Sequence, residues 1–465
     1  MNTLPPDGIR VVKYCAVLLT QAALLIAASA VANTTRASLA PAPDSRPNIL
    51  VIMTDDQGHD TLTSQFMPFT KSMIADQGVT FTRGYVSTAI CGPSRASLLT
   101  GKYARNHGVR NNPDPLLEES FAESLHRAGY FTGMIGKYLN SWPGGARPEY
   151  DFWTCWLHGY TNPIMNVLGA ERPVPGYLSY VLRDYAVEFL EKAPTDKPFF
   201  LLLAPRSPHR PATPAPDHQN LYQDVAPWRP PNFNPPSLSG KPAWLQATQQ
   251  LSPREVDEID AFRLKQLRAL KSVDECVRDV VNKLAEQGRL DNTFIVYYSD
   301  NGQFLGEHRL TGKDHVYDEA SRVPFVVRYP RLAPAPRLES SLVGVIDLAP
   351  TFYDLAGIPI PDGINGRSLM PLLRGATEWR DSMLLEGWPG VDAEESAAGL
   401  LPDGVPGPHY EALRTNRYLY VESDQDKTEL YDMESDPYQL TNLADDPSRK
   451  KLIRKLRKRL RAGDF

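Results

Sequence analysis

The sequence has little cysteine, little net charge and only one long apolar run. Its 465 residues include four cysteines, and three remain after residue 32, which leaves room for at most one disulfide in the mature chain. The formal net charge of −5 gives no support to nucleic-acid binding as the main role. Beyond the N-terminus no apolar segment is long enough to cross a bilayer, so we expect no stable membrane insertion.

The one apolar run belongs to an export signal. Arg10 and Lys13 precede apolar residues 16–26, and Ala30-Val31-Ala32 has the small residues of a cleavage site. We therefore predict a signal peptide over 1–32, a flexible Ala/Pro-rich leader over 33–46, and a periplasmic or secreted mature protein. An exported chain with an odd number of cysteines has either one disulfide or none.

Apolar segments and turn signals predict an α/β protein. Residues 47–53, 130–137, 198–204, 293–298 and 323–329 have the composition of strands, most of them buried. Residues 121–128, 182–190 and 252–288 have helical spacing, whereas 141–177, rich in Trp, Gly, Pro and Tyr, is predicted to form long loops. Nine basic residues between Arg449 and Arg461 lie on an amphipathic C-terminal helix. Their simplest interpretation is a solvated face, and contact with an acidic polymer or membrane is the alternative.

The stretch from Cys91 to Gly101 indicates a reactive side chain at a helix N-terminus. Gly92 permits an unusual backbone angle, Pro93 suits a first helical position, and Gly101 can end the helix. The N–H groups of a helix N-terminus favour negative charge, and Arg95 would stand one turn further on. These features suit a sulfate or phosphate ester. A buried cysteine before an ordinary helix is the alternative for a lone cysteine.

Acidic side chains follow two of the predicted strands. Asp55 and Asp56 come directly after residues 47–53, and Asp300 and Asn301 follow residues 293–298. Ligands bind at the carboxyl ends of strands in an α/β sheet, and adjacent carboxylates favour a cation. Hard oxygen ligands indicate Ca²⁺, with Mg²⁺ or Mn²⁺ less suited. A solvated Asp-Asp turn is the alternative for the first pair.

The pattern C-x-P-S-R-x-x-x-L-T-G, present here from Cys91 to Gly101, resembles the signature of the type I sulfatases. That resemblance implies that a maturation enzyme oxidises Cys91 to formylglycine. It also implies an alkaline-phosphatase-like fold, a large mixed sheet sandwiched by helices with a smaller C-terminal antiparallel sheet and helix. We expect the catalytic domain over 47–374 and the smaller subdomain over 375–465. If Cys91 is modified, Cys155 and Cys276 are the only pair left, and the sequence does not decide whether they meet.

The resemblance also implies a set of site residues. It makes Cys91 a metal ligand together with the four residues at the two strand ends, Asp55, Asp56, Asp300 and Asn301. It gives the binding of sulfate to Arg95, Lys137 and Lys313, and the protonation of the leaving oxygen to His209. His107, Asn140 and His308 are candidates for contact with substrate, with a structural role as the alternative for His107. Leu139 stands where the family carries a histidine, which leaves one proton transfer unassigned.

The segment Gly136-Lys137-Tyr138-Leu139-Asn140 resembles the glucosamine-6-sulfatase branch. It implies hydrolysis of a sulfate ester on a small molecule or glycan, such as 6-sulfo-N-acetylglucosamine or an aryl sulfate. Two alternatives remain: a formylglycine phosphonate monoester hydrolase or phosphodiesterase on the same fold, and a glycan-binding pseudo-sulfatase without activity.

Overall fold

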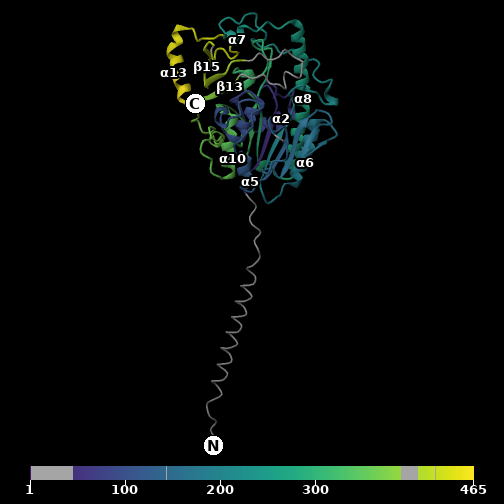
Figure 1. The fold of residues 1–465 in the computed structure, drawn as a ribbon. Helices are drawn as coiled ribbons and strands as arrows, with labels where there is room; N and C mark the ends of the chain where they lie inside the picture. The colour runs from purple at the N-terminus through teal and green to yellow at the C-terminus, as the bar shows by residue number, and fades with distance from the viewer. Residues whose placement is uncertain (2–44, 143, 389–406, 425) are drawn as a thin grey trace. The chain divides into compact units, whose positions relative to one another are not determined.

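The computed structural model describes residues 1, 45–142, 144–388, 407–424 and 426–465 (Figure 1). The predicted signal peptide after Met1, with Cys15, and all but the last two residues of the predicted leader lie outside this part of the chain. Ser45–Phe465 forms one compact unit. Within the described residues, no helix combines the length and the apolar composition that a membrane crossing requires.

The centre of this unit is a mixed sheet of ten strands in the order β12-β2-β11-β8-β1-β7-β3-β4-β5-β6. The strands are β1 (Asn48–Thr54), β2 (Val79–Tyr85), β3 (Phe131–Gly136), β4 (Phe152–His158), β5 (Ile164–Val167), β6 (Ala170–Pro173), β7 (Phe199–Ala204), β8 (Thr293–Ser299), β11 (Phe325–Arg328) and β12 (Arg337–Gly344). Strand β1 pairs in parallel with β7 and β8, and β3 pairs in parallel with β7. The carboxyl ends of these four strands therefore lie at one edge of the sheet.

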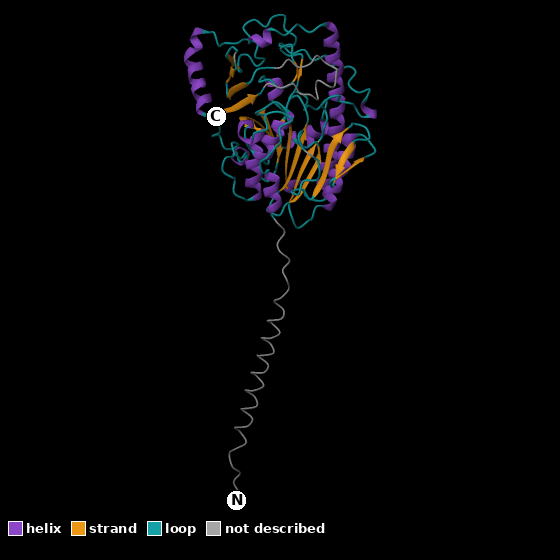
Figure 2. Cartoon of the chain, viewed as in Figure 1, coloured by secondary structure: helices purple, strands orange, loops and turns teal. Residues whose placement is uncertain are grey.

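Helices cover both faces of this sheet (Figures 1 and 2). Ile49, Val51 and Met53 of β1 pack in one apolar cluster and the intervening Leu50 and Ile52 in the other, as the two-residue period of a strand requires. On the first face lie α3 (Cys91–Thr100), α5 (Phe121–Arg127) and α10 (Leu348–Ala356). On the second lie α2 (Pro68–Met73), α6 (Leu178–Lys192) and the long α8 (Pro253–Glu286).

A second, antiparallel sheet follows near the C-terminus. It has the order β13-β14-β15-β16, with β13 (Ser382–Gly387), β14 (Tyr410–Thr415), β15 (Tyr418–Ser423) and β16 (Glu429–Asp432). Helix α13 (Lys450–Ala462) packs against β14 and β15. Short elements complete the unit: α4 (Ala104–His107), α7 (Ala243–Gln246), α9 (Asp318–Ser321), α11 (Met370–Leu373), and a two-stranded sheet of β9 (Phe304–Leu305) and β10 (Thr311–Gly312). The boundary expected near residue 375 falls between α11 and β13.

The fold confirms the predicted architecture of a large helix-covered mixed sheet with a small antiparallel sheet. The expectation for 141–177 was wrong, because β4, β5 and β6 extend the large sheet there. Their aromatic residues serve the core: Trp153 is fully buried and packs against Tyr138 and Tyr150. Cys155 and Cys276 are free thiols buried in the two clusters on opposite faces of the sheet, so they do not pair.

Candidate active site

The candidate site lies at the sheet edge where the four parallel strands end. Asp55 and Asp56 follow β1, and Asp300 and Asn301 follow β8. Lys137 follows β3, and the loop after β7 carries His209. Because the strands are parallel neighbours, side chains from four distant parts of the chain meet at this edge.

Cys91 is the first residue of α3, as predicted, and its thiol is fully buried among charged groups. Its Sγ lies 3.3 Å from Asp55 Oδ1 and 3.0 Å from Lys313 Nζ. Burial and the neighbouring Asp55 raise the pKa of Cys91 well above its ordinary value. An unmodified Cys91 is therefore a neutral thiol and a poor nucleophile in this site.

The expectation of an unusual backbone angle at Gly92 was wrong. Gly92 lies within α3 with no positive φ, and its N–H donates to Asn112 Oδ1 over 2.8 Å. A Cβ at Gly92 would stand 3.0 Å from the same Oδ1 atom, closer than most real Cβ contacts. The glycine thus allows close approach of the Asn112 loop. Gly101 ends the helix with φ 68°, as predicted.

Four cations surround the three carboxylates of the site. Arg95 donates from Nε to Asp300 Oδ2 over 2.8 Å, and Lys313 Nζ lies 2.7 Å from Asp56 Oδ1. Lys137 Nζ and Arg206 Nη1 lie 2.9 and 3.0 Å from the same oxygen, Oδ2 of Asp55. The site therefore carries excess positive charge even before a metal ion is considered, which suits an anionic substrate.

The charged neighbours and burial give the carboxyl groups of Asp55 and Asp300 different pKa values. Burial alone would raise the pKa of Asp55, but Lys137, His209 and Arg206 hold it well below its ordinary value. Burial and the negative charge of Asp55 raise the pKa of Asp300 to about 6, against the opposing effect of Arg95. Asp300 is thus the less acidic of these two carboxyl groups.

The residues present fit a divalent cation. Donor atoms of Asp55, Asp56, Cys91 and His209 all lie within 4.8 Å of one another. Asp56 Oδ2 and Asn301 Oδ1 are buried and have no hydrogen-bond partner within the described part of the chain. A bound cation would satisfy both oxygens and would offset the cost of burying them. Carboxylate and amide oxygens are the donors that hard cations prefer.

His209 lies beside this cluster. Its Nε2 is 3.5 Å from Asp56 Oδ2, and its Nδ1 is 3.0 Å from the carbonyl oxygen of Arg210. Burial and Arg206 lower the pKa of His209 well below its ordinary value. The neutral form with its proton on Nδ1 donates to that carbonyl, so Nε2 faces the site.

Arg206 belongs to the site although it was not among the residues selected from the sequence. Its guanidinium contacts Asp55 and lies 4.9 Å from the centre of the Trp156 ring. It precedes His209 by three residues in the loop after β7, and that position was the only sequence signal. Trp156 comes from β4, within the segment that was expected to be loop.

Of the three residues predicted to contact substrate, His107 and His308 are buried beside partners of their own. His107 is buried beside α3, with Nε2 3.1 Å from Ser97 Oγ and Nδ1 accepting from the N–H of Val109. His308 is fully buried, with Nε2 3.2 Å from Asn232 Nδ2 and its ring 4.4 Å from that of Tyr317. Both therefore have structural contacts of their own.

Asn140, the third candidate, is half-buried close after Lys137, and its Oδ1 has no hydrogen-bond partner among the described residues. That oxygen is available to a ligand. Leu139 packs against the large apolar cluster, so no titratable group stands in the place where the family carries histidine.

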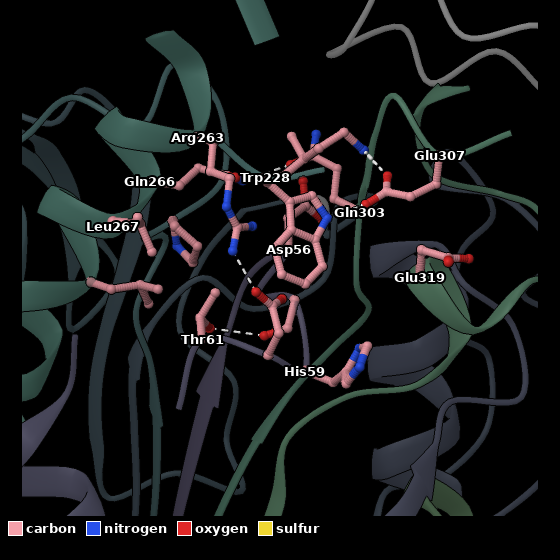
Figure 3. Close-up of a pocket in the computed structure, with 15 residues that line it drawn as sticks. Asp56, His59, Thr61, Trp228, Arg263, Gln266, Leu267, Gln303, Glu307 and Glu319 are labelled. Carbon is pink, nitrogen blue, oxygen red and sulfur yellow. Dashed lines mark hydrogen bonds and ion pairs between the residues drawn. The ribbon is translucent and has the colours of Figure 1, made fainter. Parts of the chain in front are cut away.

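A small cavity adjoins the site beyond Asp56 (Figure 3). Within it Arg263 pairs with Asp60, and Trp228 Nε1 donates to Glu307 Oε1 over 2.5 Å. Burial and the nearby Glu307 raise the pKa of Glu319 to about 8. The cavity has a volume of about 20 Å³, which accommodates a water molecule and excludes a sugar.

Comparisons with known proteins agree with this geometry. The sulfatase family model matches residues 47–358, and the model described as N-sulphoglucosamine sulphohydrolase, C-terminal, matches residues 306–464. Human N-acetylglucosamine-6-sulfatase is 34% identical over 86% of this chain and 81% of its own length. The extracellular sulfatase SULF-1 homolog of Drosophila melanogaster is 34% identical over 74% of this chain, which spans only 33% of that relative.

A solved structure shares the fold over most of the chain. It is BT4656 in complex with its substrate D-glucosamine-2-N,6-O-disulfate, with a TM-score of 0.81 and 26% identity, covering 90% of this chain and 97% of that one. The family model alone matches well over half of the present chain. The chain therefore belongs to the sulfatase family, and its activity is that of a sulfuric ester hydrolase.

Proposed function

We propose that the protein hydrolyses the 6-O-sulfate ester of a glucosamine-type sugar and releases inorganic sulfate. The observation that carries this proposal is the position of Cys91, buried between Asp55 and Lys313 at the carboxyl edge of the sheet. The choice of sugar is supported by the similarity to N-acetylglucosamine-6-sulfatase and to the structure that binds a 6-O-sulfated glucosamine. The Gly136–Asn140 segment resembles the same branch.

Two groups complete the proposed site. Cys91 would be converted to formylglycine by a maturation enzyme, and the hydrated aldehyde would offer a hydroxyl nucleophile. Asp55, Asp56, Asp300 and Asn301 would hold Ca²⁺ beside it. When bound, the cation favours the deprotonated nucleophile and offsets charge on the sulfate oxygens.

The cationic side chains would bind the sulfate and stabilise negative charge as the ester bond breaks. Lys137 and Lys313 have ammonium groups within 3.0 Å of carboxylates at the site, so a sulfate held beside them replaces or shares those contacts. Arg95 is fixed by Asp300 and by the carbonyl oxygen of Lys137, 2.6 Å away. Arg95 would therefore hold Lys137, which follows β3, and Asp300, which follows β8, in fixed positions relative to each other.

His209 would protonate the leaving sugar oxygen. Its Nδ1 is held by the carbonyl of Arg210, which directs Nε2 into the site. An anionic sulfate beside the ring favours the protonated imidazole, whose Nε2–H would then be transferred to the departing oxygen. Asn140 is proposed as a contact to the sugar, and the mature protein is proposed to act after export and removal of residues 1–32.

The test is sulfate release from a matched set of substrates. We expect 6-sulfo-N-acetylglucosamine to be hydrolysed faster than 6-sulfogalactose and p-nitrophenyl sulfate, with sulfate measured by ion chromatography. Cys91→Ala is the control for background hydrolysis. Faster turnover of a phosphonate monoester or phosphodiester than of every sulfate ester would contradict the proposal and favour the phosphonate hydrolase alternative. Absence of turnover with a verified formylglycine would favour a binding protein.

A further inference from the structure

Helix α13 concentrates positive charge at one place on an otherwise acidic chain. Residues 449–461 include nine cations and no acidic residue. The net charge of −5 therefore combines +9 in this segment with −14 in the remainder. Figure 1 shows α13 in yellow beside the small C-terminal sheet, against which it packs.

The apolar side of α13 is already covered. Leu456 and Leu460 are buried, and Leu452 and Ile453 pack against the same apolar cluster. These four side chains occupy one arc of the helix at 3.6 residues per turn. No apolar face is left for insertion into a lipid interface, which an interfacial helix requires.

Three cations of the segment form ion pairs with a carboxylate of β15 or with Asp381, which directly precedes β13. Arg457 Nε lies 2.8 Å from Glu422 Oε1, and Arg461 Nη2 lies 3.4 Å from Glu422 Oε2. Arg459 Nη2 lies 2.6 Å from Asp381 Oδ1. These pairs hold the helix on the sheet and use the carboxylates nearest to it.

The opposite side of the helix carries five cations that we call the basic stripe. Its members are Lys450, Lys451, Arg454, Lys455 and Lys458. All five are exposed, and none forms an ion pair with the described residues 45–142, 144–388, 407–424 and 426–465. At a rise of 1.5 Å per residue the stripe is about 12 Å long. Like charges at this spacing repel one another, and a linear polyanion along the stripe would relieve the repulsion.

We propose that the basic stripe binds a sulfated polysaccharide, so that the proposed sugar substrate is part of a polymer chain. The choice of a sulfated glycan over another polyanion rests on the proposed function. The rest of the chain carries a net negative charge, so long-range attraction favours the encounter of a polyanion with α13. A second contact of this kind raises the affinity for a polymer without altering the chemistry at Cys91.

The test compares a stripe variant with a matched control. The stripe variant is Lys451→Gln, Lys455→Gln and Lys458→Gln. The control removes three exposed cations located elsewhere, by Arg172→Gln, Lys197→Gln and Arg374→Gln. Binding to immobilised heparin is measured by surface plasmon resonance at 50 and 200 mM salt, and hydrolysis of monomeric 6-sulfo-N-acetylglucosamine is measured in parallel.

We expect the stripe variant to bind heparin roughly tenfold more weakly than the control variant, and wild-type binding to weaken as salt increases. Monosaccharide hydrolysis should be equal in all three proteins, because no changed residue contacts the site. Equal heparin binding by both variants, or no binding by the wild type, would overturn the inference. So would equally tight binding of double-stranded DNA or of anionic phosphatidylserine vesicles. If none of the proteins hydrolyses the monosaccharide while heparin binding still differs, the proposed function fails and the polyanion site stands.

Discussion

Arg206 Nη1 lies 3.0 Å from Asp55 Oδ2, although the two residues are 151 positions apart in the chain. The contact exists because β1 and β7 are parallel neighbours, and each of these residues follows the end of its strand. Lys137, from the end of β3, approaches the same oxygen from the next strand. A single buried carboxylate therefore links three strands of the site.

Replacing Arg206 should weaken catalysis more than folding. For Arg206→Ala we expect kcat/KM for a sulfate ester to fall roughly a hundredfold, because Asp55 loses a charge partner that holds it in position. Arg206→Lys should recover part of the loss, since it restores the charge without the planar contact to Trp156. The exposed Arg172→Ala is the control. Unchanged kinetics in Arg206→Ala would show that Lys137 alone is sufficient to hold Asp55.

Replacing Cys91 should abolish turnover. In a host that does not modify serine, Cys91→Ser should lose nearly all sulfatase activity, because a serine hydroxyl cannot return to an aldehyde after sulfate leaves. In the wild type, the peptide containing residue 91 should be about 18 Da lighter than its cysteine form, as expected for a thiol converted to an aldehyde. Full activity in the serine variant would refute the role of Cys91.

Removing divalent metal should lower both activity and stability. After dialysis against EDTA we expect loss of turnover and a lower Tm, with both restored by Ca²⁺ better than by Mg²⁺. Calcium at a hundred times its Kd should contribute about 2.7 kcal/mol to the free energy of unfolding. In Asn301→Ala, which lacks one buried oxygen, the change in Tm with calcium should be smaller. A Tm of the wild type that does not respond to either cation would contradict a metal site here.

His107 should make the stability of the protein depend on pH. Burial and Lys102 lower its pKa to about 4 in the folded protein, from an ordinary value of 6.5. Between these values the unfolded chain binds more protons than the folded chain, so the free energy of unfolding falls as pH decreases from 6.5 towards 4. A shift of this size corresponds to roughly 3 kcal/mol.

The comparison for this effect is His107→Gln, which keeps a side-chain donor near Ser97 and does not titrate. Urea unfolding between pH 4 and 7 should show a shallower decline for the variant than for the wild type. If the free energy of unfolding declines equally in both proteins, His107 does not cause the loss of stability at low pH. If the variant also keeps the wild-type KM, the histidine has a structural role and does not contact substrate.

Local sequence was sufficient to predict most of the helices and strands of the large sheet. The apolar runs around 48–54 and 293–299 form buried strands, and the capping box at Ser252 begins the long helix α8. Cys91 and its neighbours form the helix that their residue types favour. The segment 141–177 was misjudged, because its turn-forming and aromatic residues concealed three strands whose pairing depends on the adjacent β3.

The buried strands and the acidic residues that follow β1 and β8 are evident from local sequence, because hydrophobic periodicity and turn chemistry are local properties. The fold alone places β8, β1, β7 and β3 side by side, since strand order depends on non-local packing. It brought Arg206 to Asp55, placed His308 against Tyr317, and put Cys155 and Cys276 on opposite faces of the sheet. It also sorted the cations of α13 into paired and unpaired sets, because ion pairing depends on which carboxylates the packed sheet presents.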